Sequence, residues 1–144
     1  IIAGGGISAQ TQACRQIVEL VDLYPTIVEH AGYQVPSVLE GESLVPLLND
    51  PLANWDKPAI SQVIHSRGQA YGFSLRTDRW RYTEWKRGAA GRELYDHEND
   101  PDEVTNLADY PEHEALVKRL SEQLKPYVET MSTASESPKK GGKG

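Results

Sequence analysis

The feature that most limits the possible fold is a pair of alternating segments between residues 71 and 85. Apolar side chains stand at every second position from Tyr71 to Leu75 and again from Trp80 to Tyr82, with polar or small residues between them. A period of two places alternate side chains on opposite faces of a β-strand. Because Thr77-Asp78-Arg79 between the segments is typical of a turn, the pair is predicted to be an antiparallel hairpin with one apolar face.

Two further strands and a helix complete the predicted C-terminal half. Residues 60–65 and 92–96 are predicted strands, which makes a small antiparallel sheet of about four strands. Asp109 and Glu112 have the spacing of a capping box for a final helix, which Pro126 is expected to kink or end early. The stripe of that helix predicted to pack on the sheet consists of Leu116, Leu120, Leu124, Tyr127 and Met131. The predicted fold class is therefore α+β.

Two short helices are predicted before the sheet. Asp22 can cap a helix that begins at about Leu23 and ends at about Ala31, with Gly32 just beyond its end. Ser43 can cap a second helix, which carries three leucines and ends before Pro51.

Composition excludes several classes of protein. The net charge of −6 over 144 residues argues against a nucleic-acid partner, and no apolar run approaches the ~20 residues of a membrane span. Cys14 is the one cysteine, so an internal disulfide and a multi-cysteine zinc site are excluded. Residues 130–144 carry no hydrophobic pattern and are predicted to be a disordered tail.

The N-terminal segment contains an incomplete cofactor-binding motif. Ile1-Ile2-Ala3 is predicted to end a buried strand, and Gly4-Gly5-Gly6-Ile7-Ser8-Ala9 matches the G-x-G-x-x-A fingerprint of dinucleotide-binding proteins. The residues that follow, as far as Gln16, are polar and cannot form the crossover helix that such a site needs. A plain loop is therefore favoured.

A second candidate is the acidic run Asp96, Glu98, Asp100, Asp102, which has the spacing of a calcium-binding loop. Pro101 and Leu107 occupy the positions where that loop needs Gly and Glu, so a turn is favoured. The four histidines show no metal-binding spacing. No metal ligand is assigned in this chain.

Basic residues on and near the hairpin form a third candidate. Arg76, Arg79 and Arg81 can share one face and meet sulfate, phosphate or carboxylate. Cross-strand ion pairs are the favoured alternative, with the possible partners Asp78, Glu84 and Glu93. His65 and Arg67, at the end of a predicted strand, could also meet an anion, although a solvated strand end is favoured there.

Three segments together resemble the late part of sulfatases. VDLYPT at 21–26 is followed by L-x-G-x-S-L-x-P-L-L at 39–48, the hairpin lies at 71–85, and ELYD at 93–96 is followed by Asp100-Pro101 and Asn106-Leu107-Ala108. The resemblance covers residues 1–128. R-Y-T-x-W at 81–85, with Ser61-Gln62 upstream, is most similar to the iduronate-2-sulfatase branch.

The resemblance implies part of a sulfuric ester hydrolase of the alkaline phosphatase superfamily. Residues 1–52 would end its α/β catalytic domain, 53–129 would form its C-terminal subdomain, and 130–144 the tail. The absence of an initial Met is consistent with a fragment. Such enzymes use a formylglycine, made from Cys or Ser in C/S-x-P-S/A-R, and a calcium ion. That motif is absent here, and Cys14 is followed by Arg15-Gln16, so both cofactors are expected in a missing N-terminal part.

The resemblance also gives expectations about partners. The chain is expected to pack on that missing catalytic domain and to be inactive alone, with no catalytic residue of its own. His65 and Arg67 are the candidate substrate-binding residues at the rim of a pocket for a sulfated glycan. The alternatives are a stand-alone module that binds anions or sulfated glycans and an inactive remnant. Family members are secreted, periplasmic or lysosomal, but the compartment does not follow from this chain.

Overall fold

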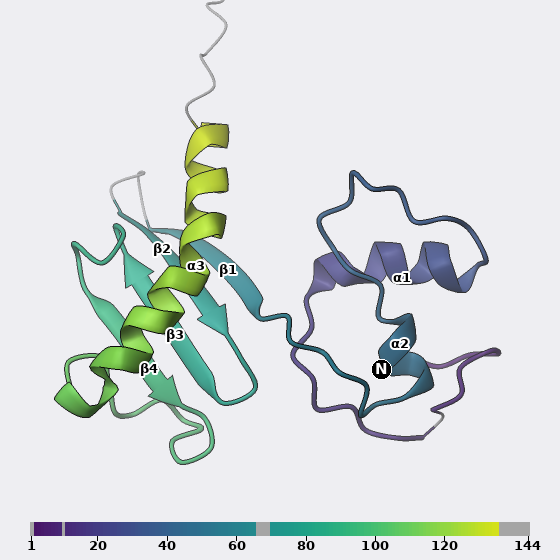
Figure 1. Ribbon diagram of the computed structural model, residues 1–144, viewed down its shortest axis with the longest axis horizontal. Coiled ribbons are helices and arrows are strands. Elements are labelled where there is room, and N and C mark those ends of the chain that lie inside the picture. Colours follow the sequence, from purple (N-terminus) through teal and green to yellow (C-terminus); the bar gives the residue numbers. More distant parts are fainter. Residues whose placement is uncertain (1, 10, 66–69, 136–144) are drawn as a thin grey trace, which may run out of the picture. The chain divides into compact units, whose positions relative to one another are not determined.

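The computed structural model describes residues 2–9, 11–65 and 70–135, and the chain divides into two compact units (Figure 1). The first unit is Ile1–Ala59 and the second is Ile60–Gly144. The predicted boundary between residues 52 and 53 concerns the domains of a longer enzyme and stays a prediction. Among the helices of the described residues, none has the length and apolar character needed to cross a bilayer.

The second unit is built on a four-stranded sheet with the order β1-β2-β3-β4. The strands are β1 (Ala59–His65), β2 (Ala70–Arg76), β3 (Trp80–Trp85) and β4 (Arg92–Asp96). β3 pairs antiparallel with both β2 and β4. The predicted hairpin and the predicted α+β class are therefore confirmed.

The helix α3 (Glu114–Ser135) covers one face of this sheet (Figure 1). Tyr82 lies at the centre of the apolar face, where its Cα is paired with Leu75 of β2 on one side and with Leu94 of β4 on the other. The core that these strands and α3 enclose consists of Phe73, Leu75, Tyr82, Leu94, Val117, Leu120, Leu124 and Val128. The remaining face of the sheet is not covered by α3.

The buried stripe of α3 differs in part from the predicted one. Leu120 and Leu124 are buried as expected, but Val117 and Val128 complete the stripe, while Tyr127 is 37% exposed and Leu116 only partly buried. Both stripes have helical spacing and share two leucines, so the sequence pattern alone does not distinguish them. The side chain of residue 131 lies outside the described part.

The start and the end of α3 also correct the predictions. The 3₁₀ helix η2 (Pro111–His113) precedes α3, and its N-cap is Tyr110 without a side-chain cap bond, so the predicted capping box is wrong. Proline favours the first position of a helix, which moves the start past Asp109. The helix continues through Pro126, which is exposed, so that water can reach the carbonyl that loses its donor. It reaches Ser135, within the predicted tail; residues 136–144 lie outside the described part.

The described residues of the first unit form three short helices, which are η1 (Leu20–Asp22), α1 (Leu23–His30) and α2 (Val45–Asn49). Gly32 follows the C-cap of α1 with φ +81°, as its position predicted. Asp22 is the N-cap of α1, as predicted, although its side chain makes no cap bond. The second predicted N-cap is wrong: Leu44 is the N-cap of α2, although Ser43 Oγ accepts the Val45 N–H at 3.2 Å.

The predicted N-terminal strand is not formed by Ile2 and Ala3, because both are exposed and in no strand. A strand needs a neighbouring strand to bind its backbone, and the strands of the described residues all lie between 59 and 96. The glycine-rich segment after it is a turn, with no helix among residues 11–19, as the loop interpretation predicted.

Candidate functional site

Asp22, in the VDLYPT segment, organises the first unit. Its carboxylate is buried and accepts hydrogen bonds from the backbone N–H of Glu19 at 2.8 Å and of Glu42 at 2.9 Å, and from Lys57 Nζ at 2.7 Å. Burial alone would raise the pKa of Asp22, but these donors outweigh it and lower the pKa below its ordinary value. This aspartate therefore holds three segments of the chain together.

Thr26 and Gly41 explain two more positions of the family-like segments. Thr26 Oγ1 donates to the carbonyl of Asp22 at 2.5 Å and accepts the Leu44 N–H at 2.8 Å, which links α1 to the start of α2. A Cβ at Gly41 would lie 2.1 Å from the carbonyl oxygen of Val21, so the close approach of two backbones requires glycine there. These motif residues have structural roles.

The predicted substrate-binding residues fall at the connection between β1 and β2. His65 is the last residue of β1, and the structure describes its backbone but not its side chain. Arg67 lies outside the described residues. Their predicted role therefore stays a prediction.

Arg79 has other acidic partners than Arg81, which pairs with Glu103. Arg79 lies in the turn between β2 and β3, and its Nε and Nη2 are 2.8 and 2.6 Å from the two carboxylate oxygens of Asp96, while Nη1 is 2.8 Å from Glu98. The Arg79 guanidinium holds the pKa of Asp96 far below its usual range. For Arg79 the prediction of ion pairs is confirmed, but with other acidic partners than those predicted.

The predicted acidic partners are engaged elsewhere. Asp78 accepts the backbone N–H of Arg79, and Glu93 accepts the indole N–H of Trp85 at 2.9 Å. Glu84 faces α3, because alternate residues of β3 point to opposite faces of the sheet.

The acidic run after β4 forms a turn. Asp100 accepts the backbone N–H groups of Val104 at 3.0 Å and Thr105 at 2.8 Å, and these bonds lower its pKa. The structure therefore supports the turn interpretation over the calcium loop. In the part of the chain that the structure describes, no three His, Cys, Asp or Glu side chains are grouped as a metal ion requires.

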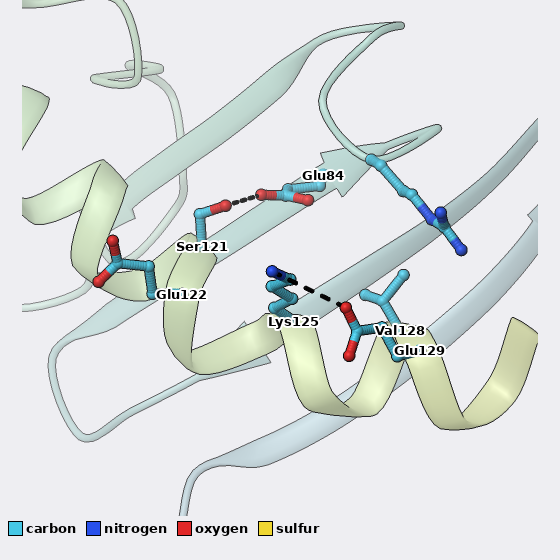
Figure 2. A pocket seen from close by; sticks show the side chains of 7 residues that line it. Glu84, Ser121, Glu122, Lys125, Val128 and Glu129 are labelled. Atoms are coloured by element: carbon cyan, nitrogen blue, oxygen red, sulfur yellow. Dashed lines mark hydrogen bonds and ion pairs between the residues drawn. The ribbon is translucent and has the colours of Figure 1, made fainter.

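A pocket of about 240 Å³ opens beside α3 and the end of β3 (Figure 2). At its base lies the buried carboxylate of Glu84, whose Oε1 accepts the hydroxyl of Tyr82 at 2.8 Å and that of Ser121. Burial raises the pKa of Tyr82, and the neighbouring Glu84 raises it further. These bonds attach α3 to the sheet.

The predicted sites do not include this pocket. Its rim carries both signs of charge, with Lys125 Nζ 3.9 Å from Glu129. The alternation of side chains along β3 could have indicated the pocket, since it places the charged Glu84 on the otherwise apolar face of the sheet. Among the residues that line the pocket, Ser121 carries a hydroxyl, and this hydroxyl is bonded to a carboxylate and not to an imidazole.

The fold of the second unit and the Asp22-centred first unit together define the class of protein: the C-terminal part of a sulfatase. The chain belongs to that family, since the family described as N-sulphoglucosamine sulphohydrolase, C-terminal, matches residues 4–130. The predicted sulfatase resemblance is thereby confirmed.

Named relatives show how much of a sulfatase the chain represents. Arylsulfatase K of Bos taurus is 37% identical over 137 residues, which are 89% of this chain and 25% of that protein. The Delta 4,5-hexuronate-2-O-sulfatase of Bacteroides thetaiotaomicron is 32% identical over 133 residues, 89% of this chain and 27% of its own length. The chain thus spans about a quarter of these relatives.

Solved structures agree with the fold. A 2-O GAG sulfatase is 30% identical, with a TM-score of 0.77 over 95% of this chain and 30% of its own. A putative sulfatase from Bacteroides thetaiotaomicron is 31% identical, with a TM-score of 0.66 over 82% of this chain and 26% of its own. A stand-alone binding module is not favoured, because the matched proteins are about four times as long. The iduronate-2-sulfatase branch is not confirmed.

Proposed function

We propose that this chain is the C-terminal, supporting part of a sulfuric ester hydrolase whose catalytic groups lie on residues outside it. The sequence contains no C/S-x-P-S/A-R motif, and the chain spans about a quarter of its curated relatives. The polar side chains described above at Asp22, Glu84 and Asp96 are bonded to groups that hold the fold together. We therefore assign the catalytic steps to residues in another part of the enzyme.

The observation that carries this proposal is the apolar surface of η1 and α1. Leu20 is 86% exposed, Ile27 is 65% exposed and Tyr24 is 60% exposed. Large apolar side chains this close in sequence are characteristic of a surface that another part of a protein covers. We assign that cover to the catalytic domain of the same enzyme.

The proposed substrate is a sulfated glycan that carries a 2-O-sulfated uronic acid, as an iduronate-2-sulfatase-like enzyme would take. Support comes from relatives whose names specify a Delta 4,5-hexuronate-2-O-sulfatase and a 2-O GAG sulfatase. His65 and Arg67 are the proposed contacts to this substrate. Arg67 is suited to the role because a guanidinium binds sulfate oxygens through two parallel N–H groups.

Calcium and formylglycine belong to the proposed enzyme and not to this chain. Within the described ranges, no set of carboxylates converges as calcium requires. Cys14 is exposed, and its Sγ lies 3.6 Å from the carbonyl oxygen of Pro51. Because Arg15-Gln16 follows it, this cysteine does not fit the formylglycine motif.

Activity and assembly test the proposal together. The chain alone, supplied with calcium, is expected to release no sulfate from a 2-O-sulfated heparin disaccharide. The bovine arylsulfatase K segment that precedes the matched region, produced separately, is expected to bind this chain. Leu20→Asp with Ile27→Asp is expected to abolish that binding, whereas the exposed pair Val104→Asp with Tyr110→Asp on the second unit serves as the matched control. Sulfate release by the chain alone, with contaminating enzyme excluded, would overturn the proposal.

A further inference from the structure

Arg76 and Arg81 lie opposite each other on the face of the sheet that α3 leaves uncovered. Their Cα atoms are partners in the β2–β3 register, and Arg81 is in turn the partner of Tyr95 on β4. The Arg81 guanidinium carbon lies 5.3 Å from the centroid of the Tyr95 ring. Two positive charges and an aromatic ring thus form one row across three strands.

Both guanidinium groups have a buried nitrogen without a hydrogen-bond partner. These atoms are Nη1 of Arg76 and Nε of Arg81. A buried N–H group without an acceptor loses its hydrogen bonds to water without replacement, which destabilises the fold more when the group is charged. The described residues therefore leave two charged donors unsatisfied at one place.

The carboxylate that pairs with Arg81 does not satisfy them. One oxygen of Glu103 lies 2.5 Å from His97 Nε2, and the other pairs with Nη2 of Arg81. Glu103 has φ +55° and lies in the turn that Asp100 holds through its bonds to the following backbone. Its position is thus set by the fold, with both oxygens engaged.

The charges around Arg76 do not supply the missing acceptors. Burial lowers the pKa of Arg76, and the neighbouring charge of Arg81 lowers it further, against the opposing influence of Glu103 and Asp78. The Asp78 carboxylate accepts the backbone N–H of Arg79. Glu103 and Asp78 therefore act on Arg76 through their charges, and an added oxyanion would supply acceptors for the two unpartnered N–H groups.

We propose that Arg76 and Arg81 together bind an oxyanion, a carboxylate or a sulfate group, on the uncovered face of the sheet. An oxyanion presents at least two oxygens to the two unpartnered N–H groups, and guanidinium groups bind such oxygens in forked geometry. The group can come from a carboxylate side chain in the rest of the longer enzyme or from a free sulfate. The inference does not depend on the proposed function.

Thermal unfolding of the full 144-residue chain tests the site. Unfolding is compared in sodium sulfate, in sodium acetate and in sodium chloride of equal ionic strength. Sulfate stabilises folded proteins in general by exclusion from their surface, so the informative quantity is the difference between variants. Arg76→Gln removes one half of the site, and Arg119→Gln, on the exposed side of α3, is the matched control.

The wild type and Arg119→Gln are expected to gain stability equally. With anion at about ten times its dissociation constant, their midpoint should rise roughly 5 °C more than that of Arg76→Gln. A larger effect of sulfate assigns the site to a free sulfate group, and a larger effect of acetate assigns it to a carboxylate side chain. Equal shifts in all three proteins with both anions would overturn the proposal.

A second measurement covers the case in which Arg76→Gln does not fold. The side-chain Nε–H resonance of Arg81 in the wild type is followed by nuclear magnetic resonance during titration with sulfate and with acetate. Binding is expected to move this resonance saturably with at least one anion, while that of Arg119 does not move. If the Arg81 resonance does not saturate with either anion, the proposal fails.

Discussion

Arg79 and Asp96 form a two-bond ion pair that joins the turn between β2 and β3 to the last residue of β4. The distances are 2.8 Å from Nε to Oδ1 and 2.6 Å from Nη2 to Oδ2. The Asp96 carboxylate also accepts the side-chain amide of Asn99 at 2.7 Å. A single carboxylate thus connects the hairpin to the turn that follows β4.

This ion pair predicts a specific acid sensitivity. Because the folded-state pKa of Asp96 lies below its unfolded value, the carboxylate stabilises the fold above the unfolded pKa of about 3.9. That stabilisation is lost as the pH falls from there through the folded pKa. Urea unfolding at a series of pH values between 6 and 2 should therefore show a shallower loss of stability for Asp96→Asn than for the wild type. Parallel pH profiles would contradict this prediction.

The set of α3 residues that are buried against the sheet predicts which substitutions in this helix lower the free energy of unfolding. Leu124 is fully buried whereas Tyr127 is 37% exposed, so Leu124→Ala should lower the free energy of unfolding by about 2–5 kcal/mol. Tyr127→Ala should cost no more than about 1 kcal/mol, since most surface changes are small. Chemical denaturation followed by circular dichroism measures both. Equal losses would support the predicted stripe over the observed one.

The close approach at Gly41 predicts a strong effect of a single methyl group. Because a Cβ there would lie 2.1 Å from a backbone oxygen of Val21, Gly41→Ala should cost about 3 kcal/mol or more through overpacking and backbone strain. Gly5→Ala is the control, because nothing lies within 4 Å of its Cβ position. Amide hydrogen exchange should show lost protection in the first unit for Gly41→Ala alone. Equal protection in the two variants would refute the close approach.

The buried carboxylate of Glu84 predicts different effects for two substitutions. Tyr82 and Ser121 both donate to the same oxygen, so Glu84→Gln can keep one acceptor for both hydroxyl groups. Glu84→Ala removes that acceptor and should cost about 1–3 kcal/mol more than Glu84→Gln. Thermal unfolding at neutral pH measures the difference. Equal losses for the two variants would show that the negative charge, and not the acceptor, holds α3 in place.

Much of the second unit was predictable because its determinants are local. β4 runs from Arg92 to Asp96, as predicted, and the turn at 77–79 connects the expected strands. Helix ends were predicted less well. Pro111 moved the start of the last helix past Asp109, and Pro126 failed to end it. The free energy that one proline costs inside a helix is smaller than the stabilisation from packing a helix face on a sheet. Packing therefore allows α3 to continue through Pro126.

The candidate sites were predictable only in part. The sequence grouped Arg76, Arg79 and Arg81, but a turn residue does not follow the two-residue period of a strand, and Arg79 bonds Asp96 instead. The structure left the predicted contacts of His65 and Arg67 untested. The pocket beside Glu84 depends on Ser121, which is 37 residues away in the chain, and no spacing rule links two such positions.

The amino-acid sequence by itself determined the strand segments, the α+β class and the sulfatase family, because these depend on short-range periodicity and on motifs. Only the tertiary structure decided which residues of α3 meet the core, that Asp22 joins three distant segments, and that Arg76 faces Arg81 without a full set of acceptors. Each of these depends on groups that are far apart in sequence. Their hydrogen bonds and burial exist only after the chain has folded.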